Sequence, residues 1–101
     1  MIKKNTRLIF TETVANPQLK VADIPSLAEI ANESNIPLLV DSTLTSSYLI
    51  NPIKYGASLV MHSLTKFMSG HGTAMGGIII DSGDFDWNLS KKFPTLTEPY
   101  E

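Results

Sequence analysis

The feature that most constrains the fold of this chain is the short segment at residues 37–41, an unbroken apolar run Pro-Leu-Leu-Val that ends in Asp41. A strand that helices cover on both faces has apolar side chains at successive positions, as in a parallel sheet. A helical pattern precedes the run, because apolar residues recur at helical spacing from Ile24 to Ala31. Asp23 is a suitable N-cap, and Pro25 falls in the first turn, where its missing N–H costs nothing. The sequence therefore predicts a helix that ends near Asn35 and leads into a buried strand.

Further apolar runs extend this helix and strand into a sheet. The other expected elements are strands at 7–12, 58–61 and 75–81, a hydroxyl-rich loop at 42–47, a helical turn at 51–55 that Gly56 ends, and a short helix at 85–92. The first crossover is long enough to make a parallel strand pair. The loop at 67–74 is short enough for the last strand to return antiparallel to its neighbour. The expected fold class is α/β, a mostly parallel sheet with crossover helices and an antiparallel last strand.

The composition excludes several classes of protein. The 101 residues carry a formal net charge of −2 and no basic block, so nothing favours nucleic acid or an anionic membrane as a partner. The absence of cysteine excludes disulfides and thiolate metal sites. No apolar stretch approaches the roughly 20 residues of a spanning helix, so we expect a soluble, cytoplasmic protein. His62 and His71 have no partners at metal-ligand spacing and are expected to be ordinary loop histidines, so no metal site is predicted.

One lysine stands in an unusual setting. The strand expected at 58–61 ends in two hydroxyl residues, Ser63 and Thr65, and Lys66, and a glycine-rich loop follows. A lysine at the exit of a buried strand should be partly desolvated, which disfavours the ammonium form and frees the amine to attack a carbonyl group. A lysine that forms a Schiff base needs that property. The alternative is a surface loop lysine, which is the commoner role of a lysine taken alone.

A carboxylate and two hydroxyl groups complete the candidate site. Asp41 ends the run at 37–41, and α/β sheets bind ligands at the carboxyl ends of their strands; alternatively, Asp41 caps the following turn. Adjacent parallel strands lie about 4.8 Å apart, so Asp41 and Lys66 could border one ring. Ser63 and Thr65 point to one side of the chain, where they could bind a phosphate or satisfy loop backbone groups. Together these residues suggest pyridoxal 5'-phosphate (PLP) as cofactor.

Two neighbouring patterns give weaker signals. Asn16 follows the first strand and could bond a ligand oxygen or cap the loop ahead of Pro17, and the residues alone favour the cap. Gly70 and Gly72 precede a strand instead of opening a helix, so they do not form a dinucleotide-binding fingerprint. A turn with close backbone approach is the simpler interpretation of these glycines.

Several segments together match the pattern of a known family. They are ETVANP at 12–17, VDST at 40–43, HSLTKF at 62–67, and the glycines from Gly70 to Gly77. From about Arg7 to its end the chain resembles the fold-type I PLP enzymes of cysteine and methionine metabolism. These include cystathionine γ-synthase, methionine γ-lyase and O-acetylhomoserine sulfhydrylase. The ending at 81–99 is more similar to the O-acetylhomoserine sulfhydrylase branch.

The resemblance implies a role for each candidate residue. Lys66 would carry PLP covalently, and Asp41 would partner the pyridine nitrogen and keep it protonated. The remaining cofactor-binding residues would be Thr43 and Asn16 close to the cofactor, and Ser63 and Thr65 at its phosphate.

The resemblance also implies a reaction. In the sulfhydrylase branch Lys66 moves protons at Cα and Cβ, acetate leaves Cγ of O-acetylhomoserine, and sulfide or a thiol adds there to give homocysteine or methionine. The partners would be a small amino-acid substrate and further copies of the chain in a homo-oligomer. Methionine γ-lyase or cystathionine γ-synthase chemistry is the alternative within the class. A truncated remnant without turnover is the alternative from another class.

The chain departs from the family in two positions and in length. Ser42 stands where the family usually has Asn, and Val14 where Pro is common. Family members are several times longer, with a phosphate-binding glycine loop and a ring-stacking tyrosine upstream, and a small domain with a carboxylate-binding arginine downstream. About four strands and one convincing helix would also leave one sheet face uncovered. We therefore expect residues 1–101 to be the central part of a PLP-binding large domain, without the N-terminal arm and C-terminal small domain, and inactive in isolation.

Overall fold

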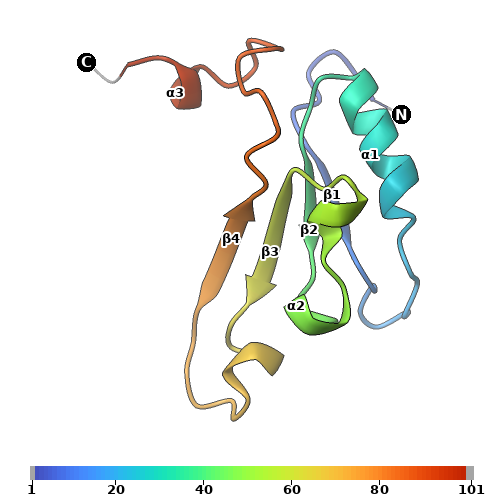
Figure 1. Cartoon of the computed structure of the whole chain (residues 1–101), viewed down its shortest axis with the longest axis vertical. Coiled ribbons are helices and arrows are strands. Elements are labelled where there is room, and N and C mark those ends of the chain that lie inside the picture. Colours follow the sequence, from blue (N-terminus) through green and yellow to red (C-terminus); the bar gives the residue numbers. More distant parts are fainter. Residues whose placement is uncertain (1, 100–101) are drawn as a thin grey trace.

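The computed structural model describes residues 2–99 and has an α/β fold, as the sequence predicts (Figure 1). Its elements are β1 (Ile9–Glu12), α1 (Ile24–Glu33), β2 (Leu38–Asp41), α2 (Ser46–Leu49), the 3₁₀ turn η1 (Pro52–Tyr55), β3 (Leu59–Ser63), the 3₁₀ turn η2 (Phe67–Ser69), β4 (Gly77–Asp81) and α3 (Pro94–Thr97).

The strands form one sheet in the order β1-β2-β3-β4. β1, β2 and β3 run parallel, and β4 returns antiparallel to β3, so the predicted direction of the last strand is confirmed (Figure 1). The register pairs Glu12 with Asp41, and Asp41 with Met61. The carboxyl ends of three strands therefore meet at one edge of the sheet, where the polar loops that follow them gather.

α1 begins at the N-cap that the sequence predicts. Asp23 Oδ1 accepts the backbone N–H of Ser26 at 3.2 Å, and Asp23 Oδ2 accepts the Ser26 hydroxyl at 2.8 Å. Both bonds lower the pKa of the Asp23 carboxyl, and the bond from the Ser26 hydroxyl has the larger effect. The helix ends at Glu33 with Ser34 as its C-cap, close to the predicted end.

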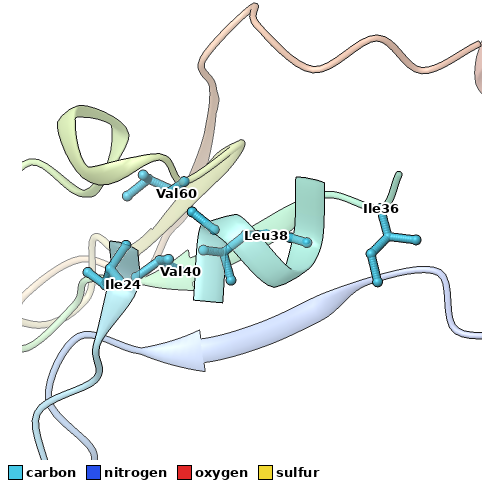
Figure 2. Close-up of a cluster of buried hydrophobic side chains, with 8 residues drawn as sticks. Ile24, Ile36, Leu38, Val40 and Val60 are labelled. Atoms are coloured by element: carbon cyan, nitrogen blue, oxygen red, sulfur yellow. The ribbon is translucent and has the colours of Figure 1, made fainter. Parts of the chain in front are cut away.

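The core lies between α1 and one face of the sheet. Its buried side chains are Ile24, Ala28, Ala31, Ile36, Leu38, Val40, Ala57 and Val60. Figure 2 shows Val40 and Val60, on neighbouring strands, gathered with Ile24 at the start of α1. Every second side chain along a strand points to α1, which places Leu38, Val40 and Val60 in the core. Ala28 and Ala31 are small, which lets α1 approach the sheet closely.

A glycine is required where the chain leaves η1 beside α1. Gly56 has a φ of 98°, in the left-handed region, and a Cβ built on it would lie 2.7 Å from the Cβ of Ala28. η1 ends at this residue, as predicted. The close approach lets Ala57 join the core and Ile53 pack against it.

The opposite side of the sheet, called the open face here, carries apolar side chains away from α1. The register places on it Phe10, Leu39, Leu59, Met61 and Ile79. Phe10 is 54% exposed and Ile79 is 62% exposed, whereas the core residues on the α1 side are buried. The prediction that one sheet face would lack cover is confirmed.

The segment after β4 differs from the sequence prediction. The helix expected at 85–92 is wrong, because the structure has turns there. Asp86 Oδ1 accepts the N–H of Asn88 at 2.9 Å, and Ser82 Oγ accepts the N–H of Asp84 at 3.1 Å. Such local bonds from side chains to backbone compete with helix formation.

An aromatic cluster organises this segment instead. The ring centroids of Phe85 and Trp87 lie 4.9 Å apart, and those of Trp87 and Phe93 lie 5.2 Å apart, in edge-to-face contact. Lys92 Nζ donates to the carbonyl of Thr6 at 2.9 Å and ties the segment to the chain before β1. A second difference is α2, which forms within and after the hydroxyl-rich stretch expected as a loop.

The open face predicts self-association of the isolated chain, because exposed contiguous apolar surface favours contact with other apolar surfaces. Phe10→Lys combined with Ile79→Lys should shift the chain toward monomer in analytical ultracentrifugation and reduce its binding of the dye ANS. Tyr48→Lys is the control, since Tyr48 is 92% exposed on α2 and does not belong to the open face. An unmodified chain that stays monomeric and binds no ANS would contradict this prediction.

Candidate functional site

The loops that follow β1, β2 and β3 border a cavity of about 780 Å³. All the residues predicted for the site line it, namely Asn16, Asp41, Thr43, Ser63, Thr65 and Lys66. They come from three separate stretches of the sequence, and the parallel register brings these stretches to the same edge of the sheet.

Asp41 presents one carboxylate oxygen to its own turn and leaves the other free. Its Oδ1 accepts the N–H of Thr43 at 2.9 Å, which is the capping role considered from the sequence. Within residues 2–99 its Oδ2 has no hydrogen-bond partner, and the residue lines the cavity. The capping and ligand-binding interpretations of Asp41 are therefore compatible, because each uses a different oxygen.

Thr43 joins the loops after β2 and β3. Besides its N–H bond to Asp41, its hydroxyl oxygen accepts the N–H of Ser63 at 2.8 Å. The hydroxyl of Ser63 makes no hydrogen bond inside the described part of the chain, although the residue lines the cavity. Ser63 can therefore donate to an anion such as a phosphate.

Thr65 is tied to Gly76 at the start of the return to β4. Its hydroxyl oxygen accepts the N–H of Gly76 at 3.0 Å and lies 3.3 Å from the Gly76 carbonyl, to which the hydroxyl donates. Thr65 thus satisfies loop backbone groups, the alternative that the sequence left open. Donation to a phosphate would require its proton to turn from Gly76 to the ligand.

Lys66 follows β3 in a tight turn. Its N–H donates to the Ser63 carbonyl at 3.4 Å, and its own carbonyl accepts the Ser69 hydroxyl at 3.2 Å. Its side chain lines the cavity but is exposed. The expected partial desolvation of Lys66 is therefore wrong for this chain, because the turn carries the residue past the end of the buried strand.

Asn16 reaches the cavity from the loop after β1. Its N–H donates to Glu12 Oε2 at 3.2 Å, so Glu12 fixes the backbone of this loop. Glu12 also lines the cavity and lies beside Asp41 in the strand register. Two carboxylates on neighbouring strand ends give this side of the cavity a negative character that suits a cationic ring nitrogen or ammonium group.

Sequence reasoning missed part of the cavity lining. Val14, Leu44 and Phe67 contribute apolar surface beside the predicted polar residues. They lie in loops, where no period in the sequence indicates which way a side chain points. Glu12 was recognisable, since in-register parallel strands would place it next to Asp41.

His62 is a strand residue and not the loop residue expected. It lies on β3, is 1% exposed, and its Nδ1 is 3.2 Å from the Ser42 carbonyl. Because a carbonyl only accepts, the ring proton is on Nδ1. His71 is exposed in the loop after η2, as expected. Across residues 2–99 no three potential ligands gather as a metal site, and no helix is long and apolar enough to cross a bilayer.

The sequence matches the family described as Cys/Met metabolism PLP-dependent enzyme over residues 1–97. This chain belongs to that family. The resemblance drawn from the residues around Asp41 and Lys66 is therefore confirmed at the level of the family.

Curated relatives match almost the whole chain, and two of them illustrate the likeness. O-acetyl-L-homoserine sulfhydrylase of Leptospira meyeri is 51% identical over 94 residues, which cover 93% of this chain and 21% of that protein. Homocysteine synthase of Schizosaccharomyces pombe is 46% identical over 101 residues, which cover 98% of this chain and 24% of that protein. The chain thus spans less than a quarter of the length of these relatives.

A solved structure agrees with the fold. A Campylobacter jejuni protein assigned as O-acetylhomoserine (thiol)-lyase superposes with a TM-score of 0.80 at 40% identity, over 83% of this chain and 21% of that chain. That protein carries a lysine bearing a pyridoxyl 5'-monophosphate group. The match confirms the expected fold class.

The cavity predicts where PLP attaches. The test protein is a hybrid in which this chain replaces the matching segment of the Leptospira meyeri sulfhydrylase. Borohydride should fix bound PLP on Lys66, because this lysine lines the cavity, and peptide mapping by mass spectrometry would locate it. Lys54 and Lys91 are internal controls, since both are exposed and do not line the cavity. Labelling of either control instead of Lys66 would refute the assignment.

Proposed function

We propose that this chain is the lysine-bearing segment of a PLP-dependent enzyme that performs γ-replacement on O-acetylhomoserine with sulfide or a thiol. The observation that carries the proposal is the convergence of Lys66, Asp41 and Ser63 on one cavity at the carboxyl ends of parallel strands. Family membership and the names of the sulfhydrylase relatives support the same chemistry.

The residues around the cavity fit PLP. Its volume of about 780 Å³ falls within the roughly 300–1,000 Å³ that small-ligand pockets usually have. The phosphate can accept from the unengaged hydroxyl of Ser63, the pyridine nitrogen can meet the free oxygen of Asp41, and the aldehyde can meet the Lys66 amine. Val14 and Leu44 add apolar surface that suits an aromatic ring.

Each side chain then has a task in the reaction. Bound PLP supplies an electron sink for the electrons left when a proton leaves Cα of an amino acid. Asp41 would hold the ring nitrogen with a carboxylate that the Thr43 N–H orients. Lys66 would hold the aldehyde end of the cofactor and, when its amine is free, would move protons at Cα and Cβ of the substrate.

The reaction exchanges one group at Cγ of the substrate. Acetate leaves with the electron pair of the Cγ–O bond, and hydrosulfide or a thiolate forms the new Cγ–S bond. The products are acetate and homocysteine, or a methionine-type thioether when a thiol adds. The sulfhydrylase and homocysteine synthase names of the relatives favour this reaction over γ-elimination and over cystathionine synthesis.

We infer that residues 1–101 act as the central part of a PLP-binding large domain in a longer, homo-oligomeric, cytoplasmic enzyme. One line of support is the open face, which needs further elements to cover it. The other is that the chain matches less than a quarter of the length of its relatives. The missing parts implied by the resemblance are the phosphate-binding glycine loop, the stacking tyrosine and the arginine for the substrate carboxylate. The partner at the site is a small amino acid.

Asp41→Asn tests the electron-sink role in the hybrid. The variant should retain bound PLP but lose about 100-fold or more in the rate of homocysteine formation, since an amide does not hold the ring-nitrogen proton and each ~1.4 kcal/mol of barrier is tenfold. Asp81→Asn is the matched control, a strand-end aspartate at the opposite end of the sheet. Near-normal turnover by Asp41→Asn would leave Asp41 as a cap only.

The hybrid also tests the function as a whole. It should bind PLP and convert O-acetylhomoserine and sulfide to homocysteine, followed by product assay, because the host supplies the missing substrate-binding parts. The isolated chain should bind PLP weakly and show no γ-replacement, since it has only part of the site. A hybrid that binds PLP on Lys66 without turnover would favour the alternative that this chain is a non-catalytic, truncated remnant. A monomeric, cooperatively unfolding 101-residue chain that turns over O-acetylhomoserine would contradict the expected dependence on further segments.

A further inference from the structure

A row of hydroxyl groups lies behind Asp41, outside the lining of the cavity. Ser42 Oγ is 2.8 Å from Thr45 Oγ1, which is 2.9 Å from Thr13 Oγ1, and Thr13 Oγ1 is 3.4 Å from the carbonyl oxygen of Asp41. Thr13 is 3% exposed and Ser42 is fully buried. We call Ser42, Thr45 and Thr13 the hydroxyl chain. Its members lie on the exits of β1 and β2 and the loop before α2, and none of them lines the cavity.

The hydroxyl chain also reaches two backbone carbonyls. The Thr13 hydroxyl donates to the Asp41 carbonyl, and Thr45 Oγ1 lies 3.4 Å from the Ser42 carbonyl, which can accept its proton. In the two shorter contacts between hydroxyls, Ser42 to Thr45 and Thr45 to Thr13, either oxygen can be the donor. Within residues 2–99 the Ser42 hydroxyl bonds only Thr45, so removal of the Thr45 hydroxyl would leave a fully buried polar group unpaired, which is costly.

The hydroxyl chain is one side of a two-sided grip on the end of β2. From the β1 side, the Asp41 carbonyl accepts both the N–H of Thr13 at 2.9 Å and its hydroxyl. From the β3 side, the Ser42 N–H donates to the Met61 carbonyl at 2.9 Å, and His62 Nδ1 donates to the Ser42 carbonyl. The peptide unit that carries the Asp41 side chain is therefore fixed from both neighbouring strands.

We propose that the hydroxyl chain is a positioning device that directs the Asp41 carboxylate into the cavity. The proposal rests on the proposed function, because the partner of that carboxylate is the ring nitrogen of PLP. Ser42, Thr45 and Thr13 act through Asp41 and touch neither cofactor nor substrate. Thr45 is the central member, since its hydroxyl joins the other two.

The test uses the hybrid and a matched set of variants. Thr45→Val replaces the hydroxyl by a methyl group of similar size, and Thr45→Ser retains the hydroxyl. Ser47→Ala is the control, because it removes an exposed hydroxyl close by in the chain. The first measurement is the dissociation constant of PLP. The second is hydrogen exchange in the apoprotein at the N–H of Thr43, which bonds Asp41 Oδ1 and so reports where the carboxylate lies.

The expected result is selective. Thr45→Val should weaken PLP binding by about 3- to 10-fold, the range that one net hydrogen bond corresponds to, and should speed exchange of the Thr43 N–H several-fold. Thr45→Ser and Ser47→Ala should stay within about twofold of the parent in both measurements, which is below the effect of one bond. When Asp41→Ala is also present, Thr45→Val should change PLP affinity no further, because its effect passes through the missing carboxylate.

Two results would overturn the proposal. The first is a folded Thr45→Val variant whose PLP affinity and Thr43 exchange equal those of the parent. The second is that Thr45→Val weakens PLP binding as much in the presence of Asp41→Ala as in its absence. If Thr45→Val does not fold, Ser42→Ala removes only one end of the hydroxyl chain, and the same measurements decide. A parent hybrid without PLP on Lys66 refutes the proposed function, whereas exchange in the apoprotein still decides whether the hydroxyl chain positions Asp41.

Discussion

The parallel pairing of β1, β2 and β3 is the constraint on which the rest of the structure depends. In-register parallel strands end at one edge of the sheet, so the strand pairing alone places the residues at the ends of neighbouring strands side by side. The ladder continues past the strands, where Thr13 bonds Asp41 and Ser42 bonds Met61. Asp41 is thus held on extended sheet backbone, which fixes its carboxylate better than a loop would.

Much of this arrangement was predictable because its signals are local. The buried strand Leu38–Asp41 follows from an unbroken apolar run, α1 from its spacing and its Asp23 cap, and the return of β4 from a short loop. The positions of Asp41 and Lys66 then follow from topology, since strand exits converge. Their convergence on one cavity needed no contact information beyond strand order.

The remainder depends on contacts between distant residues, which a pattern within one segment does not contain. His62 lies on β3, and its burial depends on packing against other elements. The exposure of Lys66 depends on how far the turn carries this residue beyond the last hydrogen-bonded pair of β3. Turns form at 85–92 in place of a helix because Asp86 bonds the backbone locally. The hydrogen bond between Thr13 and Thr45 joins residues that no sequence spacing connects. Apart from the turns at 85–92, which local side-chain bonds favour, these misses arise because tertiary partners override local propensity.

The bonds between Thr65 and Gly76 have a mechanical consequence for the lysine. They close the base of residues 66–75, so the segment forms a flap whose two ends are fastened at one point. Gly70 and Gly72 have left-handed backbone, and a Cβ built on either would meet no heavy atom within 4 Å. Lys66 directly follows the fastened end of this segment, so its backbone lies next to a fixed point of the sheet while its side chain stays exposed.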